Sequence, residues 1–202
     1  ETTLSISAIY IQRILDIQVT WNIQADGTVD IAMDMKRNPI FPMLPRFGLR
    51  LFLPKEMKDV TYYGLGPVES YMDKRRASWH GEFSSPVTDL HEDYIRPQEN
   101  GSHYDCDYVT LSSNAGHLLP ERKTSLTAVS GQTFSFNASV YTEEELTNKA
   151  HNYELEECGS TVLCLDYRQN GIGSNSCGPQ LIEKYRLDET EFHFELRLKP
   201  EA

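Results

Sequence analysis

The sequence contains no long hydrophobic run. A membrane-spanning helix needs roughly 18 or more consecutive apolar residues, and no segment of the 202-residue chain approaches that length. The chain also lacks an initiator methionine and a charged-then-apolar leader, because Glu1 opens directly into alternating apolar residues. We therefore expect no membrane partner, and we expect the chain to be an excised fragment whose targeting information lies elsewhere.

Cysteine and histidine are sparse and irregularly spaced. The four cysteines form no CxxC pair and are too few to suggest a disulfide scaffold in a chain of this length, so buried thiols are expected. The six histidines show neither the HxxxH nor the HxH spacing that places two imidazoles on one metal ion. The pattern predicts no transition-metal site.

Positive charge is also in short supply. The chain has 19 basic against 30 acidic residues, which gives a formal net charge of −11. Such a chain repels a phosphate backbone and an anionic bilayer, and the short basic segment 74–76 does not reverse the balance. The charge therefore argues against nucleic acid and membrane surfaces as partners.

What the sequence does contain is alternation of apolar and polar residues with a period of two. Between residues 9 and 23 the odd positions are apolar except for Arg13, which is typical of a strand with one buried face. Turn residues follow at 25–27, and the alternation resumes over 29–35. The two runs predict an antiparallel hairpin.

Most of the remaining chain is also predicted to be strand. Segment 38–45 holds three prolines and predicts an irregular crossing, whereas 84–101 is polar and without period and predicts a long surface loop anchored by Tyr94, Ile95 and Pro97. The further strands are expected at 47–53, 60–63, 106–111, 125–129, 133–141, 161–167 and 191–198.

One segment predicts a helix. It begins after Thr142, an N-cap with Glu145 as its capping-box partner, and we expect two or three turns packed through Leu146, Ala150 and Tyr153. Short strands at close intervals with almost no helix indicate an all-β fold. We expect one large antiparallel β-sandwich over residues 1–202.

The stretch Tyr63–Arg76, which reads YGLGPVESYMDKRR, interrupts the strand pattern. Gly64 and Gly66 permit positive φ, and Pro67 restricts both itself and the residue before it. We therefore expect a defined bend directly after the apolar run. The simplest interpretation is a tight corner in a β protein, and the alternative is an active site.

Three kinds of chemistry can be weighed from the residues. A glycosidase needs two facing carboxyl groups, but acids as abundant as these, Glu69 and Asp73 among them, are more typical of a solvated surface. The sequence assigns no histidine to Cys177, and the glycine-rich loop 170–179 lacks the ending of a phosphate-binding loop. A polyol partner fits better, because hydrogen-bonding groups accompany aromatic side chains, although most of these should be packing residues. The aromatic residues are Tyr62, Tyr63, Tyr71, Trp79 and Tyr94.

Four short segments follow one another in a recognisable order. They are LPRFGL at 44–49, YGLGPVESYMD at 63–73, PQENG at 97–101, and GIG at 171–173 with Pro179. Together they resemble the C-terminal small-chain domain of bacterial β-galactosidases of glycoside hydrolase family 2, and the resemblance extends from about Tyr10 to the end of the chain. It implies a sandwich of the galactose-mutarotase-like type. It further implies a bacterial, oligomeric enzyme that hydrolyses terminal β-galactosides such as lactose with retention of configuration. The enzyme would lie in the cytoplasm or the periplasm, and the sequence does not distinguish between these two compartments.

The resemblance also implies what this chain does not carry. In that family the catalytic glutamates and the Mg²⁺ ligands belong to a preceding β/α barrel. We therefore expect no catalytic residue, metal ligand or cofactor here, and a fragment that is inactive alone. Its expected partners are the other domains of the same polypeptide, further subunits and, in the parent enzyme, the β-galactoside. The family pattern begins upstream of Glu1, so the first strands of the sandwich are expected to be missing.

The same resemblance places the glycine-rich loop at the sugar site. The family's best-known members carry a tryptophan in this loop, whereas Cys177-Gly178 stand there in this chain. Asn175, Ser176 and Cys177 are expected to form the rim of the substrate site. The other motif residues are expected to be structural: Gly64, Gly66, Pro67, Glu69, Tyr71, Asp73, Glu99, Asn100, Gly101, Gly171 and Gly173.

Two alternatives remain at this point. The mutarotase-like fold also carries free-standing aldose 1-epimerases, which work through a histidine and a glutamate. A carbohydrate-binding module of independent affinity is the other, and it would report sugar through Trp21 or Trp79.

Overall fold

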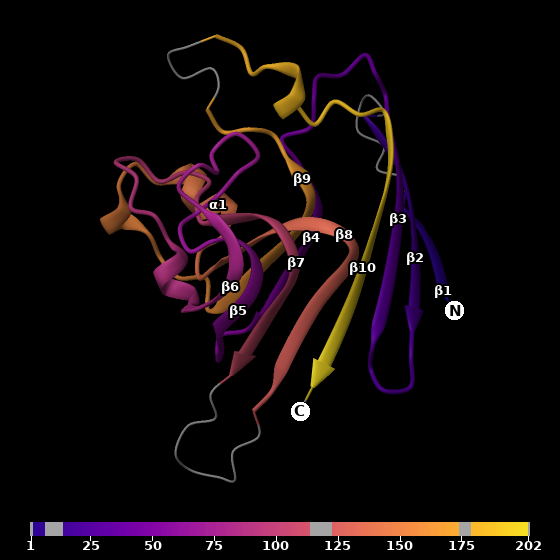
Figure 1. Cartoon of the computed structure of the whole chain (residues 1–202), viewed down its shortest axis with the longest axis horizontal. Helices are drawn as coiled ribbons and strands as arrows, with labels where there is room; N and C mark the ends of the chain where they lie inside the picture. The colour runs from indigo at the N-terminus through magenta and orange to yellow at the C-terminus, as the bar shows by residue number, and fades with distance from the viewer. Residues whose placement is uncertain (1, 7–13, 114–122, 174–178, 202) are drawn as a thin grey trace.

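The computed structural model describes residues 2–6, 14–113, 123–173 and 179–201 (Figure 1). Over these ranges the chain forms ten strands, the α-helix α1 (Glu143–Asn148) and three short 3-10 helices. The prediction of an all-β sandwich with one short helix is confirmed. The strands are β1 (Thr2–Ile6), β2 (Leu15–Ile23), β3 (Val29–Arg37), β4 (Arg46–Pro54), β5 (Met57–Gly66), β6 (Trp79–Pro86), β7 (Ser102–Ser113), β8 (Ser125–Ser139), β9 (Ser160–Gln169) and β10 (Glu191–Glu201).

All strand pairs are antiparallel, and the sheet forks at β8. The main path runs β1-β2-β3-β10-β8-β7-β5-β6. The first part of β8, residues 125–129, pairs with β10, whereas its last part, residues 135–139, pairs with β9, which in turn pairs with β4. The long bent strand β8 therefore belongs to both layers of the sandwich.

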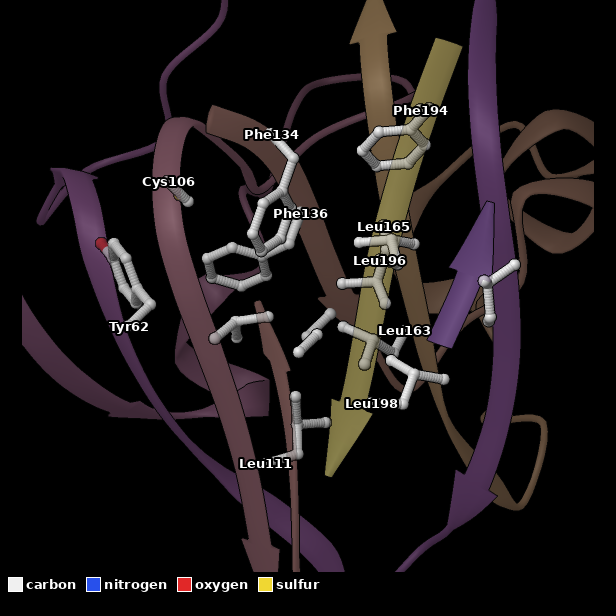
Figure 2. Close-up of a cluster of buried hydrophobic side chains, with 14 of the residues drawn as sticks. Tyr62, Cys106, Leu111, Phe134, Phe136, Leu163, Leu165, Phe194, Leu196 and Leu198 are labelled. Carbon is white, nitrogen blue, oxygen red and sulfur yellow. The ribbon is translucent and has the colours of Figure 1, made fainter. Parts of the chain in front are cut away.

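The two branches face each other across the core. Phe47 on β4 packs edge-on against Phe192 on β10 at 4.9 Å between ring centroids, and Tyr167 on β9 stacks on the same ring at 4.3 Å. Figure 2 shows Leu163 and Leu165 of β9 beside the side chains of β10. Burying a large apolar side chain stabilises the fold by about 1.5–3 kcal/mol, so this interior holds the layers together.

The predicted hairpin forms within the described residues, whereas 9–13 of its expected first strand lie outside them. Strand β2 pairs with β3 from Leu15↔Arg37 to Ile23↔Val29. The alternation expected for 29–35 is visible in the burial of Ile31, Met33 and Met35, which are at most 5% exposed. The period of two thus identified both the strands and their inner face.

Two strand predictions and one loop prediction need correction. Strand β6 lies partly inside the expected surface loop, and it was missed because its sequence, WHGEFSSP, has no clear apolar face. The two strands expected at 125–129 and 133–141 are one continuous strand, β8. Of the proposed loop anchors, Pro97 is buried, but Ile95 is 98% exposed and anchors nothing.

The helix begins as predicted but is shorter. The Thr142 side chain accepts a hydrogen bond from Glu145 N at 3.1 Å, so the N-cap is confirmed. The helix has only six residues, and Leu146 is its buried side chain. Tyr153, expected on the packed side, is 83% exposed.

The bend lies later than the glycines suggested. Gly64 and Gly66 both continue β5, and neither has a positive φ. They are glycines because a Cβ at Gly64 would collide with Cys106 and one at Gly66 with Tyr62 and Phe83. The chain leaves the strand at Pro67, after a cis Gly66-Pro67 bond.

Candidate functional site: a polar cluster that joins four segments

The four sequence segments quoted above meet in one region of the molecule. Arg46 from the first segment pairs with Glu99 from the third. Glu69 and Asp73 from the second accept hydrogen bonds from the third and the fourth, respectively. Segments separated by up to 100 residues are therefore joined by side-chain carboxylates and one guanidinium.

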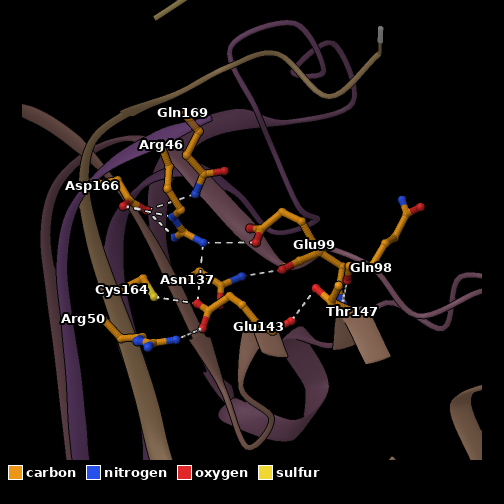
Figure 3. A network of polar contacts seen from close by, with 12 residues as sticks. Arg46, Arg50, Gln98, Glu99, Asn137, Glu143, Thr147, Cys164, Asp166 and Gln169 are labelled. Carbon is orange, nitrogen blue, oxygen red and sulfur yellow. Dashed lines mark hydrogen bonds and ion pairs between the residues drawn. The ribbon is translucent and has the colours of Figure 1, made fainter. Parts of the chain in front are cut away.

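Arg46 is the centre of a polar network that joins several elements (Figure 3). Its Nε and Nη2 donate to Asp166 Oδ1 and Oδ2 at 3.2 and 2.5 Å, while Nη1 donates to Glu99 Oε2 at 3.1 Å. Glu143 Oε1 lies 3.5 Å from the same Nη1. Burial works against the charge, but Asp166 and Glu99 more than offset it, so the pKa of Arg46 lies above its ordinary value. The network ties β4 to β9, to α1 and to loop 91–101.

The carboxylates around Arg46 have different environments. Asp166 is 2% exposed, and Gln169 Nε2 donates to its Oδ2 at 2.9 Å. Burial raises the pKa of Asp166, and Arg46 opposes that rise. Glu143 is also partly buried, which favours the neutral form, but hydrogen bonds from Cys164 and Arg50 bring its pKa below the usual value.

Glu99 differs from both. Burial raises the pKa of Glu99 to about 7, and Arg46 only partly compensates. Its Oε1 is buried and has no hydrogen-bond partner among the described residues. Four carboxyl groups contact the two guanidiniums of Arg46 and Arg50, so two negative charges are in excess when all four are ionised and one when Glu99 carries a proton. The four are those of Asp166, Glu99, Glu143 and Glu144.

Glu69 organises the second and third segments. It is 6% exposed, and its Oε2 accepts the amide hydrogen of Gly101 at 2.8 Å. Its Oε1 accepts from Lys74 Nζ and from the hydroxyl of Tyr94. Gly101 has φ +70°, and a Cβ there would collide with a backbone carbonyl, so glycine is required. The expectation that Glu69 belongs to a solvated acidic surface is wrong.

Asn100 completes the fixing of this loop. Its side-chain Oδ1 accepts a hydrogen bond from Glu92 N at 3.0 Å. Its backbone carbonyl accepts one from the side-chain amide of Asn137 on β8. Loop 91–101 is therefore held from both sides, by Glu69 and by β8. Its contacts explain how a segment without secondary structure keeps one conformation.

Asp73 holds the beginning of the glycine-rich loop. Its Oδ1 accepts from Ile172 N at 3.1 Å, and its Oδ2 accepts from Gly173 N at 2.9 Å. A Cβ on Gly171 would lie 2.5 Å from Asp73 Oδ2 and 2.9 Å from a methyl of Leu181. Two successive amides and one carboxylate thus clamp 171–173.

Asn170 supports the same loop from the other side. Its Nδ2 donates to Leu44 O at 2.6 Å, and its Oδ1 accepts from Leu187 N at 2.6 Å. The backbone of Gly171 donates to Tyr185 O at 2.9 Å. The N-terminal flank of the loop is therefore attached to the segments that contain Leu44 and Leu187.

The remaining predicted residues fall in three places. Gly64, Gly66 and Pro67 lie in or just after β5, as described. Tyr71 is 1% exposed, burial raises the pKa of its hydroxyl, and that hydroxyl has no partner among the described residues. The predicted rim residues Asn175, Ser176 and Cys177 lie outside the described residues.

Sequence reasoning missed the partners of Glu99. Arg46 was read as part of a motif and not as a site residue, and neither Asp166 nor Glu143 was singled out. Asp166 did carry a signal, because it ends the apolar run TVLCLD, where a carboxylate buried beside leucines needs a cation.

The side chains of this cluster hold segments of the chain to one another. All carboxylate oxygens of Asp166, Glu69 and Asp73 accept hydrogen bonds from protein groups. In the ranges the structure covers, no group of three or more His, Cys, Asp or Glu side chains is arranged to hold a metal ion. Nor does any helix within those ranges have the length and apolar character to cross a bilayer. Fold and cluster together define a β-sandwich domain whose polar side chains fix the course of its loops.

Comparison with known proteins places the domain in a family. A family model described as the beta galactosidase small chain matches residues 1–198, and the chain belongs to this family. A beta-galactosidase of Actinobacillus pleuropneumoniae is 44% identical over 180 residues, and one of Staphylococcus xylosus is 45% identical over 181 residues. These alignments cover 89% and 90% of this chain but 17% of each relative. The chain therefore spans about a sixth of the length of these relatives.

Proposed function

We propose that this chain is the non-catalytic C-terminal sandwich domain of a larger β-galactosidase of glycoside hydrolase family 2. The whole enzyme would hydrolyse terminal β-D-galactosides such as lactose with retention of configuration. The support is the family membership and the names of the relatives, of which the chain covers 17%. Catalytic glutamates and Mg²⁺ ligands are assigned to the rest of the polypeptide, and no step of the reaction is assigned to this chain.

The proposed role of the domain is to complete the rim of the active site. The observation that carries it is the pair of hydrogen bonds from Ile172 and Gly173 to Asp73. These bonds fix the backbone immediately before the predicted rim residues, Asn175 to Cys177. A loop that borders a substrate must keep its position to contribute binding energy, and a buried polar cluster supplies that constraint.

The domain is also proposed to support assembly of the enzyme. In this proposal its partners are the other domains of the same polypeptide and further subunits of a homo-oligomer. The small share of each relative that the chain covers supports the first of these partners, the other domains. Assembly would bring the predicted rim to a catalytic centre that lies elsewhere.

An activity assay separates the two parts of this proposal. The 202-residue chain alone should not hydrolyse a chromogenic β-galactoside, whereas the full-length enzyme should, and deletion of the domain should abolish turnover. Robust turnover by the isolated chain would overturn the non-catalytic assignment. In the full-length enzyme, Asp73→Ala should lower kcat/KM by about tenfold or more through loss of loop position.

The matched control is Asp107→Ala, which removes an exposed carboxylate from β7. It should leave kcat/KM unchanged. Equal losses in both variants would contradict the proposed role of Asp73, because removal of charge would then account for the effect.

One observation favours a second function, that of an aldose 1-epimerase. A carboxyl group with a pKa near 7, as at Glu99, suits general acid–base catalysis at neutral pH. The isolated chain would then accelerate the mutarotation of freshly dissolved α-galactose, measured by polarimetry, and Glu99→Gln would remove the effect. An unchanged spontaneous rate rejects this alternative.

A further inference from the structure

A hollow of about 460 Å³ lies on the outer face of the sheet, where β2, β3, β10 and β8 run side by side. Side chains alternate between the two faces of a strand, and Ile31 on β3 points into the core with 1% exposure. Its neighbours Asp30 and Ala32 therefore point outward, and both line the hollow. We call this feature the outer-face hollow.

The outer-face hollow exists because a small residue is surrounded by longer ones. Ala32 lies directly opposite Thr20 on β2 and directly opposite Glu195 on β10, so its methyl group forms a low floor between two polar side chains. Strand β8 stops pairing with β10 at this level, and Ser130 and Gly131 border the hollow on that side. The volume falls within the roughly 300–1,000 Å³ that is usual for small-molecule sites.

Asp30 and Arg197 form a fixed ion pair at one end of the hollow. Arg197 Nε and Nη2 donate to Asp30 Oδ1 and Oδ2 at 2.5 and 3.0 Å, and Gln24 Nε2 donates to the same Oδ2 at 2.9 Å. The hydrogen bond from Arg197 lowers the pKa of Asp30, so the carboxylate stays ionised at neutral pH. The pair presents acceptors and donors side by side while its charges cancel.

Glu195 supplies a second oriented carboxylate beside Ala32. His193 Nε2 donates to Glu195 Oε1 at 2.8 Å, and His193 Nδ1 lies 2.8 Å from Asp34 Oδ1. These two contacts raise the pKa of His193, which favours an imidazolium that donates to both carboxylates. Glu195 Oε2 has no hydrogen-bond partner among the described residues, and it remains available to a ligand.

The lining suits a neutral ligand with several hydroxyl groups. A sugar hydroxyl both donates and accepts hydrogen bonds, and the hollow offers carboxylate acceptors at Asp30 and Glu195, a donor at Arg197, and hydroxyls at Thr20 and Ser130. An anion would meet two carboxylates, whereas a cation would meet the guanidinium. A neutral polyol meets neither penalty, and its C–H groups can lie on the apolar floor.

We propose that the outer-face hollow binds a neutral monosaccharide, with a C–H face of the sugar ring over Ala32 and hydroxyl groups directed to Asp30, Glu195 and Arg197. None of the lining residues belongs to the Arg46 network or to the clamp at Asp73. The site therefore requires neither of those features, and it does not depend on the proposed galactosidase function.

Methyl NMR of the full-length enzyme and of the 202-residue chain tests this site, with galactose as the probe. In both proteins the Ala32 methyl resonance should shift saturably, with half-saturation at about 1–10 mM. The methyl of Ala128, which is 0% exposed, should not shift. The absence of a saturable Ala32 shift up to about 100 mM would overturn the proposal. A shift in the isolated chain alone would show that the rest of the enzyme covers the hollow, and this too would overturn it.

A matched pair of leucine variants tests the floor of the hollow. Ala32→Leu fills the floor and should weaken galactose binding at least about tenfold, followed through the methyls of Thr20 and Val129. Gln18→Leu adds the same side chain to an exposed position on the outer face of β2, outside the lining, and should change binding by less than about twofold. Equal affinities in the two variants would overturn the proposal.

Arg197→Met provides a test that leaves the floor intact. It removes the donor beside Asp30 from a side chain that is 49% exposed, so the fold should tolerate the change. Galactose binding should weaken at least about tenfold, because a charge-assisted hydrogen bond is lost. Wild-type affinity in Arg197→Met would contradict the assigned role of the ion pair, whatever the outcome for Ala32→Leu.

Two charged probes test the class of ligand. Ethanolamine and sulfate, at the concentrations used for galactose, should leave the Ala32 methyl in place. A saturable shift with either one that exceeds the shift with galactose would assign the hollow to a charged ligand and overturn the proposal. An enzyme that shows the galactose shift but hydrolyses no β-galactoside would reject the proposed function alone, whereas hydrolysis without the shift would reject only this site.

Discussion

Asp73 Oδ2 accepts the amide hydrogen of Gly173 at 2.9 Å, across 100 residues of sequence. The same carboxylate accepts a second amide hydrogen, from Ile172, so both of its oxygens are used. A carboxylate in this position fixes two consecutive peptide planes at once. The geometry of the following residues is therefore set by a side chain from a different part of the chain.

Removing the Asp73 carboxylate should loosen the glycine-rich loop. Asp73→Ala should lower the free energy of unfolding by about 1.5–3 kcal/mol, because two amides lose a charged acceptor. Asp73→Asn keeps one carbonyl acceptor and should lose about half of that. Urea denaturation measures both values, and Asp107→Ala, at an exposed position of β7, should stay within about 0.5 kcal/mol of wild type. An equally large loss of stability in Asp107→Ala would contradict the stabilising role of the Asp73 carboxylate.

Removing the Arg46 guanidinium should be more costly. Arg46→Met leaves the buried Asp166 carboxylate without its cation, and breaking a buried pair in this way costs about 3–5 kcal/mol. Arg50→Met, which removes a more exposed arginine from the same strand, should cost no more than about 1 kcal/mol. Similar losses of unfolding free energy in the two variants would show that the burial of Asp166 does not determine the cost of removing its arginine.

A double variant separates the charge from the packing. Arg46→Met combined with Asp166→Leu removes both buried charges, and it should recover part of the stability lost in Arg46→Met alone. Chemical denaturation of the three variants gives the coupling energy. Additive losses would argue against a direct interaction between the two side chains.

Glu99 should make the domain less stable as the pH rises. Its folded-state pKa of about 7 lies above the ordinary value of 4.5, so the folded protein holds a proton that the unfolded chain releases. The stabilisation is fully present below pH 4.5 and is lost as the pH rises through 7. Because the side chain is 32% exposed, we expect a loss of about 1–3 kcal/mol and not the full value of the shift.

Glu99→Gln isolates this effect. The variant cannot ionise, so the difference between its unfolding free energy and that of wild type should change between pH 4.5 and 8. Carboxyl groups that do not interact with Glu99 contribute equally to both proteins and cancel in the difference. A difference that does not depend on pH would contradict the raised pKa.

Two glycines provide a matched pair for a steric test. Gly171→Ala places a Cβ against Asp73 and Leu181, and it should destabilise the domain by about 1–3 kcal/mol. Gly131→Ala, in β8, meets nothing within 4 Å and should be neutral or stabilising by up to about 1 kcal/mol. Thermal unfolding of both variants checks the contrast.

Much of the fold could be predicted from local pattern, because one-sided burial imposes a period of two on a strand. The hairpin of β2 and β3 and the closing strand β10 follow from it. Strand β6 could not be found in this way, since most of its residues are exposed and its pairing with β5 is set by backbone hydrogen bonds. The same holds for the middle of β8, which bends where it passes from one layer to the other.

The polar cluster was harder to predict than the fold. Sequence shows that Asp166 is a carboxylate near leucines, but its partner Arg46 lies 120 residues away and becomes a neighbour only through pairing of β4 with β9. The glycines illustrate the same limit. The sequence shows that Gly64 and Gly66 permit positive φ. The structure requires glycine at these positions for a different reason, because a Cβ would collide with Cys106 or Tyr62.

Strand β8 hydrogen-bonds to β10 near its start and to β9 near its end, while β7 follows it along most of its length. Neither layer can separate from the other without breaking this shared strand. Unfolding should therefore be a single cooperative transition, in which the clamp at Asp73 and the Arg46 network are lost together. The loops of this domain would then keep their course for as long as the sandwich itself remains folded.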